Sequence, residues 1–305
     1  MKYPKKRKAE LLVNTWNRCN NRCVFCYNQT LMHLPLNVKE HLEMCNDMLT
    51  SSFMENFNYL RFLGGELFDG AIEKLDVKAE YWKLMHSALE LLRSNEIEKV
   101  NFLTNFIYAD NKWLKATLKF FEDNGMIDKV ELSTSYDKYG RFTEESKQWW
   151  WDNVKWVNET YPKMKIDIGM IMTQPFITSV TKEWLDNFYK VIKNVSIYFI
   201  ELDTAILKRN KQNSPYHQLF PKRKDFIQFL VNLKNWDYYD LLVKPDGTDP
   251  YNAVDAIQMV YVDEFPFPLF KNQHYLLEQR REFLEDGYCD SSVPLWTDIK
   301  RILRM

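Results

Sequence analysis

Three cysteines lie close together near the start of the chain, in the run CNNRCVFCYN. Cys19, Cys23 and Cys26 follow a short apolar segment, and this spacing allows three thiolates to bind one metal centre. Four-iron clusters ordinarily use four cysteines, so a cluster held by three keeps one iron without a protein ligand. An open iron beside a bound reactant points to chemistry and not only to electron storage.

A second motif, Gly64-Gly65-Glu66, follows the cysteines by about forty residues. The chain has only eight glycines, well below the usual ~7%, and two of them are adjacent here. Glycine allows the backbone to take positive φ or to lie close to a ligand. Alone, the pair would indicate a tight turn before a helix. One strand after the cysteines, it indicates a segment that presents backbone and the Glu66 carboxylate to a small molecule beside the open iron.

Strand-like and helix-like segments alternate over the first two thirds of the chain. Six strands are predicted, at Leu11–Trp16, Tyr59–Leu63, Val100–Phe106, Val130–Tyr136, Ile166–Thr173 and Val195–Leu202. Helices are predicted from the N-cap Asn37 to Phe53, and at Lys78–Arg93, Trp113–Phe121, Thr143–Asn158 and Lys182–Ile192. This alternation implies the α/β class, a parallel sheet with outer helices. The local pattern leaves a partial barrel and a doubly wound sheet as alternatives.

In parallel α/β folds, function gathers at the carboxyl ends of the strands. The first two predicted strand ends carry the cysteine loop and the glycine pair. The next two carry polar side chains, namely Thr104, Asn105, Ser133, Ser135 and Asp137. Unrelated core residues would not be expected to align in this way, so we expect these four ends to form one site.

These residues resemble the radical S-adenosylmethionine superfamily. The cysteine run is similar to that family's C-x3-C-x2-C loop, with the aromatic residues Phe25 and Tyr27 on either side of the third cysteine. GGEL at 64–67 resembles the Gly-Gly-Glu motif of the family. NFLTN at 101–105 and STSYD at 133–137 resemble the segments of its third and fourth strands.

The resemblance implies a partial (β/α)6 TIM-like barrel over residues 1–202, with a [4Fe–4S] cluster on the three cysteines. S-adenosylmethionine would chelate the fourth iron through its amino and carboxylate groups. An external flavodoxin- or ferredoxin-like donor would reduce the cluster. Cleavage of the sulfonium would then give a 5′-deoxyadenosyl radical that abstracts a substrate hydrogen, a step that the cofactor supplies and the protein positions.

The resemblance also assigns the cofactor contacts. Glu66, with the backbone of Gly64 and Gly65, would hold the amino group of S-adenosylmethionine. Ser135, with Asn105 or Asp137 as its partner, would contact the ribose or the carboxylate. The expected cofactor-binding set is Gly64, Gly65, Glu66, Asn105, Ser135, Asp137, Phe25 and Tyr27.

Structural zinc is the main alternative for the three cysteines, and it would make the chain a non-catalytic binding module. His33, His41 or Cys45 would complete a tetrahedral site. However, His33 lies seven residues beyond Cys26, and zinc ligands usually come as two separated pairs. Cys45 falls inside a predicted helix, where the role of a buried small apolar side chain is expected.

The composition indicates a cytoplasmic enzyme-sized protein. The 305 residues are 46% hydrophobic and 15% aromatic, and a chain of this length buries roughly three quarters of its unfolded surface. The net charge of −1 gives no strong nucleic-acid signal. The apolar run after the basic start is too short for a signal peptide or a membrane span. In a reducing compartment, clustered cysteines favour metal binding or catalysis over disulfides.

Residues 203–305 are expected to form an α-rich, substrate-specific extension packed on the core. Lys222–Leu233 and Val293–Met305 are predicted helices. Many peptide-modifying members of the family carry additional clusters on a cysteine-rich C-terminal extension. In this chain only Cys289 lies beyond Cys45, so it cannot assemble a second cysteine-bound cluster. We expect Cys289 to be a buried thiol, with a hydrogen-atom donor to a substrate radical as the alternative.

The substrate class is predicted less directly. The style of the cysteine loop and the aromatic, acidic C-terminal third favour a peptide or protein. A nucleotide, a nucleic-acid base or another small metabolite is the alternative.

Overall fold

A parallel sheet of seven strands forms the centre of the computed structural model, in the order β6-β5-β4-β3-β2-β1-β7. The structure describes residues 10–16, 18–23, 26, 37–137, 141–192, 195–200, 219, 222–238 and 257–260. The strands are β1 (Glu10–Asn14), β2 (Tyr59–Leu63), β3 (Lys99–Leu103), β4 (Val130–Tyr136), β5 (Ile166–Ile171), β6 (Val195–Ile200) and β7 (Ile257–Val260). Every neighbouring pair is parallel.

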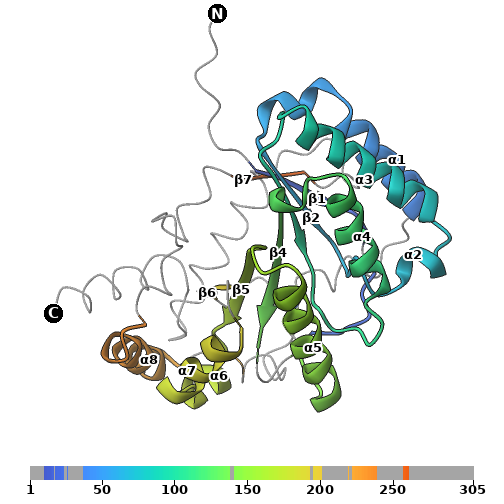
Figure 1. Cartoon of the computed structure of the whole chain (residues 1–305). Helices are drawn as coiled ribbons and strands as arrows, with labels where there is room; N and C mark the ends of the chain where they lie inside the picture. Colours follow the sequence, from blue (N-terminus) through green and yellow to red (C-terminus); the bar gives the residue numbers. More distant parts are fainter. Residues whose placement is uncertain are drawn as a thin grey trace, which may run out of the picture.

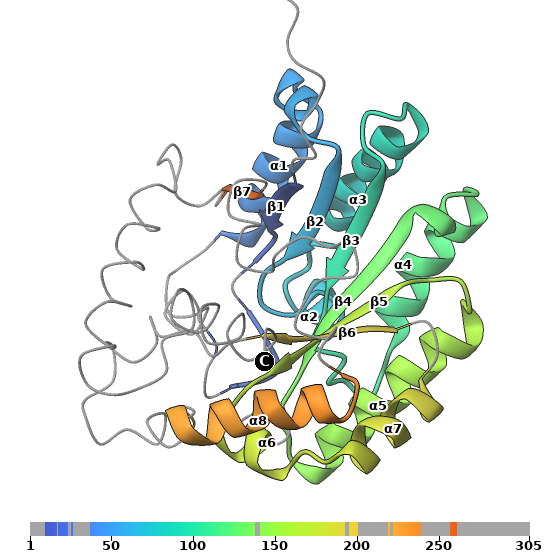
Figure 2. The same cartoon turned by 90° about the vertical axis from the view of Figure 1, so that its left-hand side faces the viewer.

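The strand order argues against one of the two architectures that the sequence left as alternatives, the doubly wound sheet. From β1 to β6 the strands follow each other without reversal, so the sheet lacks the switch point of a doubly wound fold. Figures 1 and 2 show α1, α3, α4 and α5 along one face of the sheet. Within the described residues the sheet is open, with β6 and β7 as its edges. The α/β class is therefore confirmed, and a closed or partial barrel stays a prediction.

Most of the helices follow the predicted pattern with small shifts in their bounds, whereas α2 and α6 were not predicted. They are α1 (Val38–Leu49), α2 (Ala71–Lys74), α3 (Lys78–Arg93), α4 (Lys112–Asp123), α5 (Glu144–Thr160), α6 (Gln174–Ser179), α7 (Lys182–Val191) and α8 (Arg223–Asn235), with 3-10 turns at Ser52–Asn56 and Ile127–Lys129. Asn37 caps α1, as predicted, by accepting a hydrogen bond from the backbone of Glu40. None of the helices in the described part of the chain has the length and apolar character needed to cross a membrane.

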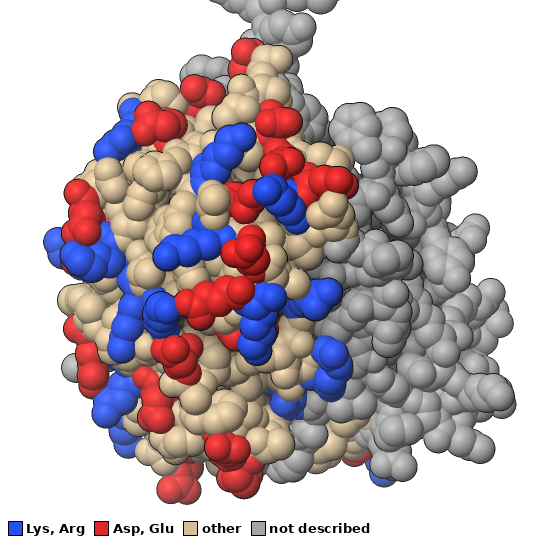
Figure 3. All heavy atoms as spheres, turned by 90° about the vertical axis from the view of Figure 1, so that its right-hand side faces the viewer, with Lys and Arg blue, Asp and Glu red and all other residues tan. Residues whose placement is uncertain are grey.

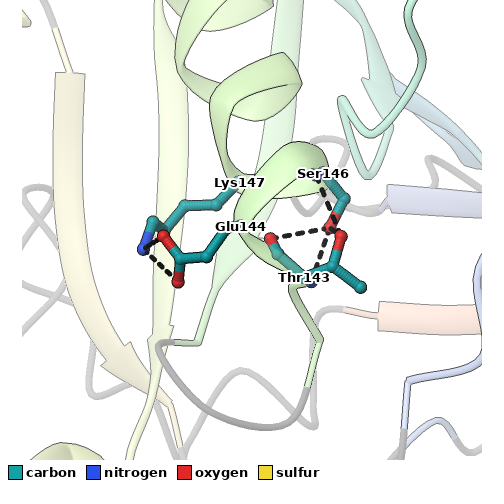
Figure 4. A network of polar contacts seen from close by, with 4 residues as sticks. All are labelled: Thr143, Glu144, Ser146 and Lys147. Atoms are coloured by element: carbon teal, nitrogen blue, oxygen red, sulfur yellow. Dashed lines mark hydrogen bonds and ion pairs between the residues drawn. The ribbon is translucent and has the colours of Figure 1, made fainter.

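Helix α5 begins at a reciprocal cap that fixes the chain just after β4. The Thr143 hydroxyl accepts from the Ser146 backbone at 3.1 Å, and the Ser146 hydroxyl accepts from the Thr143 backbone at 2.8 Å (Figure 4). The neighbouring pair of Glu144 and Lys147 is a surface ion pair, a type that contributes little to stability. The cap therefore sets where the β4–α5 connection ends.

The two faces of the sheet differ in chemistry because side chains alternate along each strand. Leu11, Val13, Phe62 and Phe102 lie on the face that packs against the helices, and the rings of Phe62 and Phe102 stack with centroids 5.4 Å apart. The opposite face carries ion pairs and polar contacts, namely Glu10–Arg61 at 2.9 Å, Lys99–Glu131 at 2.6 Å and Asn101–Ser133 at 2.8 Å. The core is thus on the helix side of the sheet.

The outer surface over the helices shows acidic and basic side chains interspersed (Figure 3). This distribution agrees with the net charge of −1. The helix-covered face in that view therefore carries no single-sign field that would attract a polyanion.

Two elements from the last third of the chain contact the rest of the structure. Strand β7, which sequence patterns did not predict, pairs with β1 over Glu10–Val13. Helix α8 lies beside α6, where the Gln174 side chain donates to Asp225 at 2.6 Å. The division into a core and an extension at residues 203–305 stays a prediction, and the predicted helix at 293–305 lies outside the described residues.

Candidate functional site

The cysteine loop leaves β1 at the carboxyl edge of the sheet. Cys19 and Cys26 are partly exposed, and Cys23 is buried. The backbone N–H of Cys26 donates to the carbonyl of Cys23 at 3.1 Å. Among the residues that the structure describes, no group of three His, Cys, Asp or Glu side chains is arranged to hold a metal ion. The thiols share one loop, and their role as ligands stays a prediction.

The glycine pair is explained by close approach of the cysteine loop's own backbone. Gly65 N donates to Trp16 O at 2.7 Å, and Glu66 N donates to Arg18 O at 2.8 Å. A Cβ atom on Gly65 would lie 1.5 Å from Arg18 O. Gly64 has φ +147°, and a Cβ there would lie 2.5 Å from Trp16 O. Because only glycine permits this approach, the pair fixes where the loop leaves the sheet.

Glu66 joins the ends of β2 and β3 from inside the protein. Its Oε1 accepts from the Thr104 hydroxyl at 2.6 Å and from Phe68 N at 3.0 Å, while Oε2 accepts from Asn105 N at 2.5 Å. The side chain is 1% exposed. Burial raises the pKa of Glu66 to about 7, against the opposing effect of these hydrogen bonds. The carboxyl is therefore a buried bridge between two strand ends.

Asn21 places two donors on the cysteine sulfurs. Its backbone N–H donates to Cys19 Sγ at 3.4 Å, and its Nδ2 donates to Cys23 Sγ at 3.3 Å. The same Nδ2 donates to Arg141 O at 3.2 Å, which ties the loop to the segment after β4. Sulfur is a weak acceptor as a thiol, so this donor set suits thiolates better.

Asn105, at the end of β3, makes a third contact of this kind. Its Nδ2 lies 3.5 Å from Cys19 Sγ and 2.9 Å from Asn20 Oδ1. Asn20 in turn donates to the carbonyl of Ile107, and its backbone N–H is bound by the Asp69 carboxylate. The loop is therefore held by the segments that follow β2, β3 and β4.

Cys19 lies in surroundings that disfavour its thiolate when no cation is bound. Burial, and then the negative charge of Glu66, raises the pKa of the Cys19 thiol to about 12. Such a thiol ionises only when a positive group offsets this cost, and a bound metal deprotonates a coordinating thiol outright. Three thiols on one loop, with N–H donors aimed at two of their sulfurs, supply the donor chemistry that thiolate ligands need, and cluster binding stays a prediction.

The polar residues of β4 contact the neighbouring strands. Asp137 is fully buried and accepts from the Thr173 hydroxyl at 3.0 Å, which links β4 to the end of β5. The Ser135 carbonyl accepts from the Arg141 guanidinium at 2.7 Å. The structure thus places Ser135 and Asp137 at the carboxyl edge of the sheet, and their expected contacts with a cofactor stay a prediction.

Two residues of the zinc alternative, His41 and Cys45, contact the end of β1. His41 Nε2 is 2.6 Å from the carbonyl of Asn14, and Cys45 Sγ is 3.9 Å from the same atom. Cys45 is completely buried in the core, which confirms its expected role. His33 lies outside the described residues, as do Phe25, Tyr27 and Cys289.

Sequence reasoning missed several residues that hold the loop, namely Asn20, Asn21, Asp69 and Arg141. The Asn-Asn pair between the first two cysteines was visible, because a side-chain amide can donate to sulfur and accept from the backbone at once. Asp69 and Arg141 gave no local signal. Their roles depend on which loops the sheet brings together.

Comparison with known proteins gives no assignment. No protein-family model and no curated protein matches the chain. A structure of HydG, a maturase of the [FeFe]-hydrogenase, has a TM-score of 0.44 at 9% identity, over 89% of this chain and 55% of HydG. HydG from Carboxydothermus hydrogenoformans gives 0.26 at 11% identity, over 97% and 82%. A dihydroorotase from Campylobacter jejuni gives 0.28 at 12% identity, over 84% and 68%.

The chain spans only about half the length of the first HydG structure. With TM-scores below 0.5 for HydG and for a dihydroorotase alike, these likenesses do not distinguish one class of protein from another. The cysteine loop and its contacts therefore provide the basis for a proposed function.

Proposed function

We propose that this chain is a radical S-adenosylmethionine enzyme whose Cys19, Cys23 and Cys26 hold a single [4Fe–4S] cluster. When bound, the cluster and S-adenosylmethionine supply abstraction of a substrate hydrogen, initiated by reductive cleavage of the sulfonium. The observation that carries the proposal is the anchoring of the C-x3-C-x2-C loop, at the carboxyl edge of β1, by the Gly-Gly-Glu segment.

The residues of this chain have two tasks in the proposal. The first is to hold the loop so that its thiols can converge, which Gly65, Glu66 and Asn105 support through their contacts with its backbone and side chains. The second is to bind S-adenosylmethionine. The backbone of Gly64 and Gly65 and the remaining acceptor position of Glu66 would take the amino group, since a carboxylate has about four acceptor sites and three are used here.

Ser135 and Asp137 complete the proposed cofactor site from β4. Their place at the same edge of the sheet as the cysteine loop supports contacts with the ribose or the carboxylate. We propose a peptide or protein as the substrate. Small metabolites are the competing candidates. A flavodoxin- or ferredoxin-like protein is the proposed reductant.

Anaerobic purification with iron, sulfide and zinc analysis tests the proposal. We expect about four irons per chain after reconstitution, and 5′-deoxyadenosine when S-adenosylmethionine and a strong reductant are added. Cys23→Ala is expected to lose both. Cys45→Ala is the matched control, because Cys45 is a buried cysteine packed on the helix side of β1, and it should keep both.

Two outcomes would overturn the proposal. Tightly bound zinc with no cluster after reconstitution would indicate the binding-module alternative. A cluster that yields no 5′-deoxyadenosine under reduction would indicate an electron-transfer or structural centre instead.

A further inference from the structure

The orientation of the Asn105 side chain is fixed by its surroundings. Its Oδ1 accepts from the backbone N–H of Ile107 at 2.6 Å. A backbone N–H can only donate, so the oxygen of the amide must face Ile107 and the nitrogen must face the cysteine loop. The Nδ2 group there lies 3.5 Å from Cys19 Sγ and 2.9 Å from Asn20 Oδ1.

The backbone of Asn105 is held as firmly as its side chain. Its N–H donates to Glu66 at 2.5 Å, and the preceding residue, Thr104, donates its N–H to Ser133 O at 2.9 Å. The following residue, Phe106, has φ +54°, which turns the chain away from the β3 direction. The amide is therefore aimed at Cys19 by a rigid strand end and not by the loop that carries the cysteine.

We propose that Asn105 is a positioning residue that donates a hydrogen bond to the Cys19 ligand and raises the reduction potential of the cluster. The inference rests on the proposed function. Reduction adds negative charge to the cluster and its thiolates, and an N–H donor stabilises the more negative state more strongly. Removing the donor therefore makes reduction harder.

Asn21 supplies an independent example of the same arrangement. Its Oδ1 accepts from the backbone N–H of Arg22 at 2.8 Å, which turns its Nδ2 toward Cys23 Sγ at 3.3 Å. Two asparagines from different elements thus have their oxygens occupied by backbone donors and their nitrogens directed at cysteine sulfurs. Asn105 is the better test of the two, because it lies outside the loop that must fold around the cluster.

Redox titration of the reconstituted protein, followed by electron paramagnetic resonance of the reduced cluster, tests the inference. We expect Asn105→Ala to lower the equilibrium constant for reduction about tenfold, which is about 59 mV for one electron. Asn105→Asp should lower it further at pH 8, because it places a negative charge beside Cys19. Asn111→Ala, which removes an amide hydrogen bond to Asn153 in the same β3–α4 connection, should leave the potential unchanged.

The comparison of Asn105→Ala with Asn105→Gln separates tuning from mere support of the fold. Asn105→Asp lowers the potential through its added charge whether or not the native amide donates, so it tests only that the position lies beside the cluster. Tuning by the donor places Asn105→Gln, which keeps an amide, nearer to wild type than Asn105→Ala. If Asn105→Ala fails to retain iron, Asn105→Gln is measured in its place. Because Asn105→Gln keeps an amide, its reduction potential should lie between those of wild type and Asn105→Asp.

The possible results are distinct. Equal potentials in loaded wild type, Asn105→Ala and Asn105→Asp, or a potential for Asn105→Asp at or above wild type, would overturn this inference alone. Failure of the wild-type protein to form a cluster would overturn the proposed function and the inference with it.

Discussion

The strand ends on the two sides of the site have different hydrogen-bond partners. The ends of β2 and β3 bind the cysteine loop, through the N–H groups of Gly65 and Glu66 and through the Asn105 amide. The ends of β4 and β5 bind each other, through Thr173 and Asp137. The β2–β3 half therefore holds the loop through several hydrogen bonds, whereas the β4–β5 half contacts it through Asn21 and Arg141 and is braced mainly by its own contact.

This difference separates two kinds of loss. A change at β2 or β3 should disturb the loop and, with it, cluster assembly. A change at the Thr173–Asp137 contact between β4 and β5 should cost stability but disturb the loop less.

The largest effect is expected at Gly65. In Gly65→Ala the new Cβ would lie 1.5 Å from Arg18 O, so the loop backbone must move and its two hydrogen bonds to this segment must break or lengthen. We expect a loss of about 3 kcal/mol in the free energy of unfolding, measured by chemical denaturation, together with loss of reconstituted iron.

Gly125→Ala is the control for this change. A Cβ at Gly125 meets nothing within 4 Å, and its φ of +68° gives only the ordinary cost of a left-handed residue, about 1–2 kcal/mol. Full iron content in Gly65→Ala would show that the glycine pair does not position the loop.

The next largest effect is expected from Glu66, whose titration makes the free energy of unfolding depend on pH. Its pKa is about 7 in the folded protein and ordinary, at 4.5, when unfolded. Between these values the unfolded state loses its proton first, so the folded protein is destabilised as pH rises through this window. Below the window both states are protonated, and the penalty is absent.

Glu66→Gln removes this titration. The free energy of unfolding of the variant relative to wild type should therefore rise between pH 4.5 and 7, by roughly 3 kcal/mol at most. Denaturation curves collected at intervals across the window measure it. Parallel pH profiles for the two proteins would contradict a buried carboxyl whose pKa is raised.

The fold was predictable where an apolar pattern fills a whole element. The bounds of β2, β4 and α3 coincide with their predictions, because alternation or helical spacing runs to both ends. Strand β3 was predicted to reach Phe106 but ends at Leu103. Apolar residues resume at Phe106, but Thr104 and Asn105 contact Glu66, a tertiary contact that a local pattern cannot reveal.

Within the site, rare residue types were predictable from the sequence and common ones were not. Cysteines and adjacent glycines are conspicuous because they are rare and closely spaced in this chain. The asparagines that contact the sulfurs belong to common residue types, and their roles depend on how far each neighbouring strand extends. The glycines were predicted to present backbone to a small molecule, which stays a prediction, and the structure shows the backbone of Trp16 and Arg18 lying against them.

The smallest effect gives the most direct test of the two halves. Thr104 and Thr173 are both buried threonines that donate a hydroxyl to a buried carboxylate, Glu66 in one half and Asp137 in the other. Replacing either by valine keeps the shape and leaves an acceptor short of one donor, at a cost of about 1–3 kcal/mol. Denaturation should therefore show similar losses for Thr104→Val and Thr173→Val.

Cluster content should separate the two variants. Thr104 bonds the same carboxylate that holds the backbone of Asn105, so Thr104→Val loosens a contact to the cysteine loop and should lower the iron retained after reconstitution. Thr173→Val loosens the contact between β4 and β5 and the cap of α6, and should retain iron as wild type does. Equal iron in both variants would mean that the edge of the sheet behaves as one unit, because the loop would then be insensitive to which half is weakened.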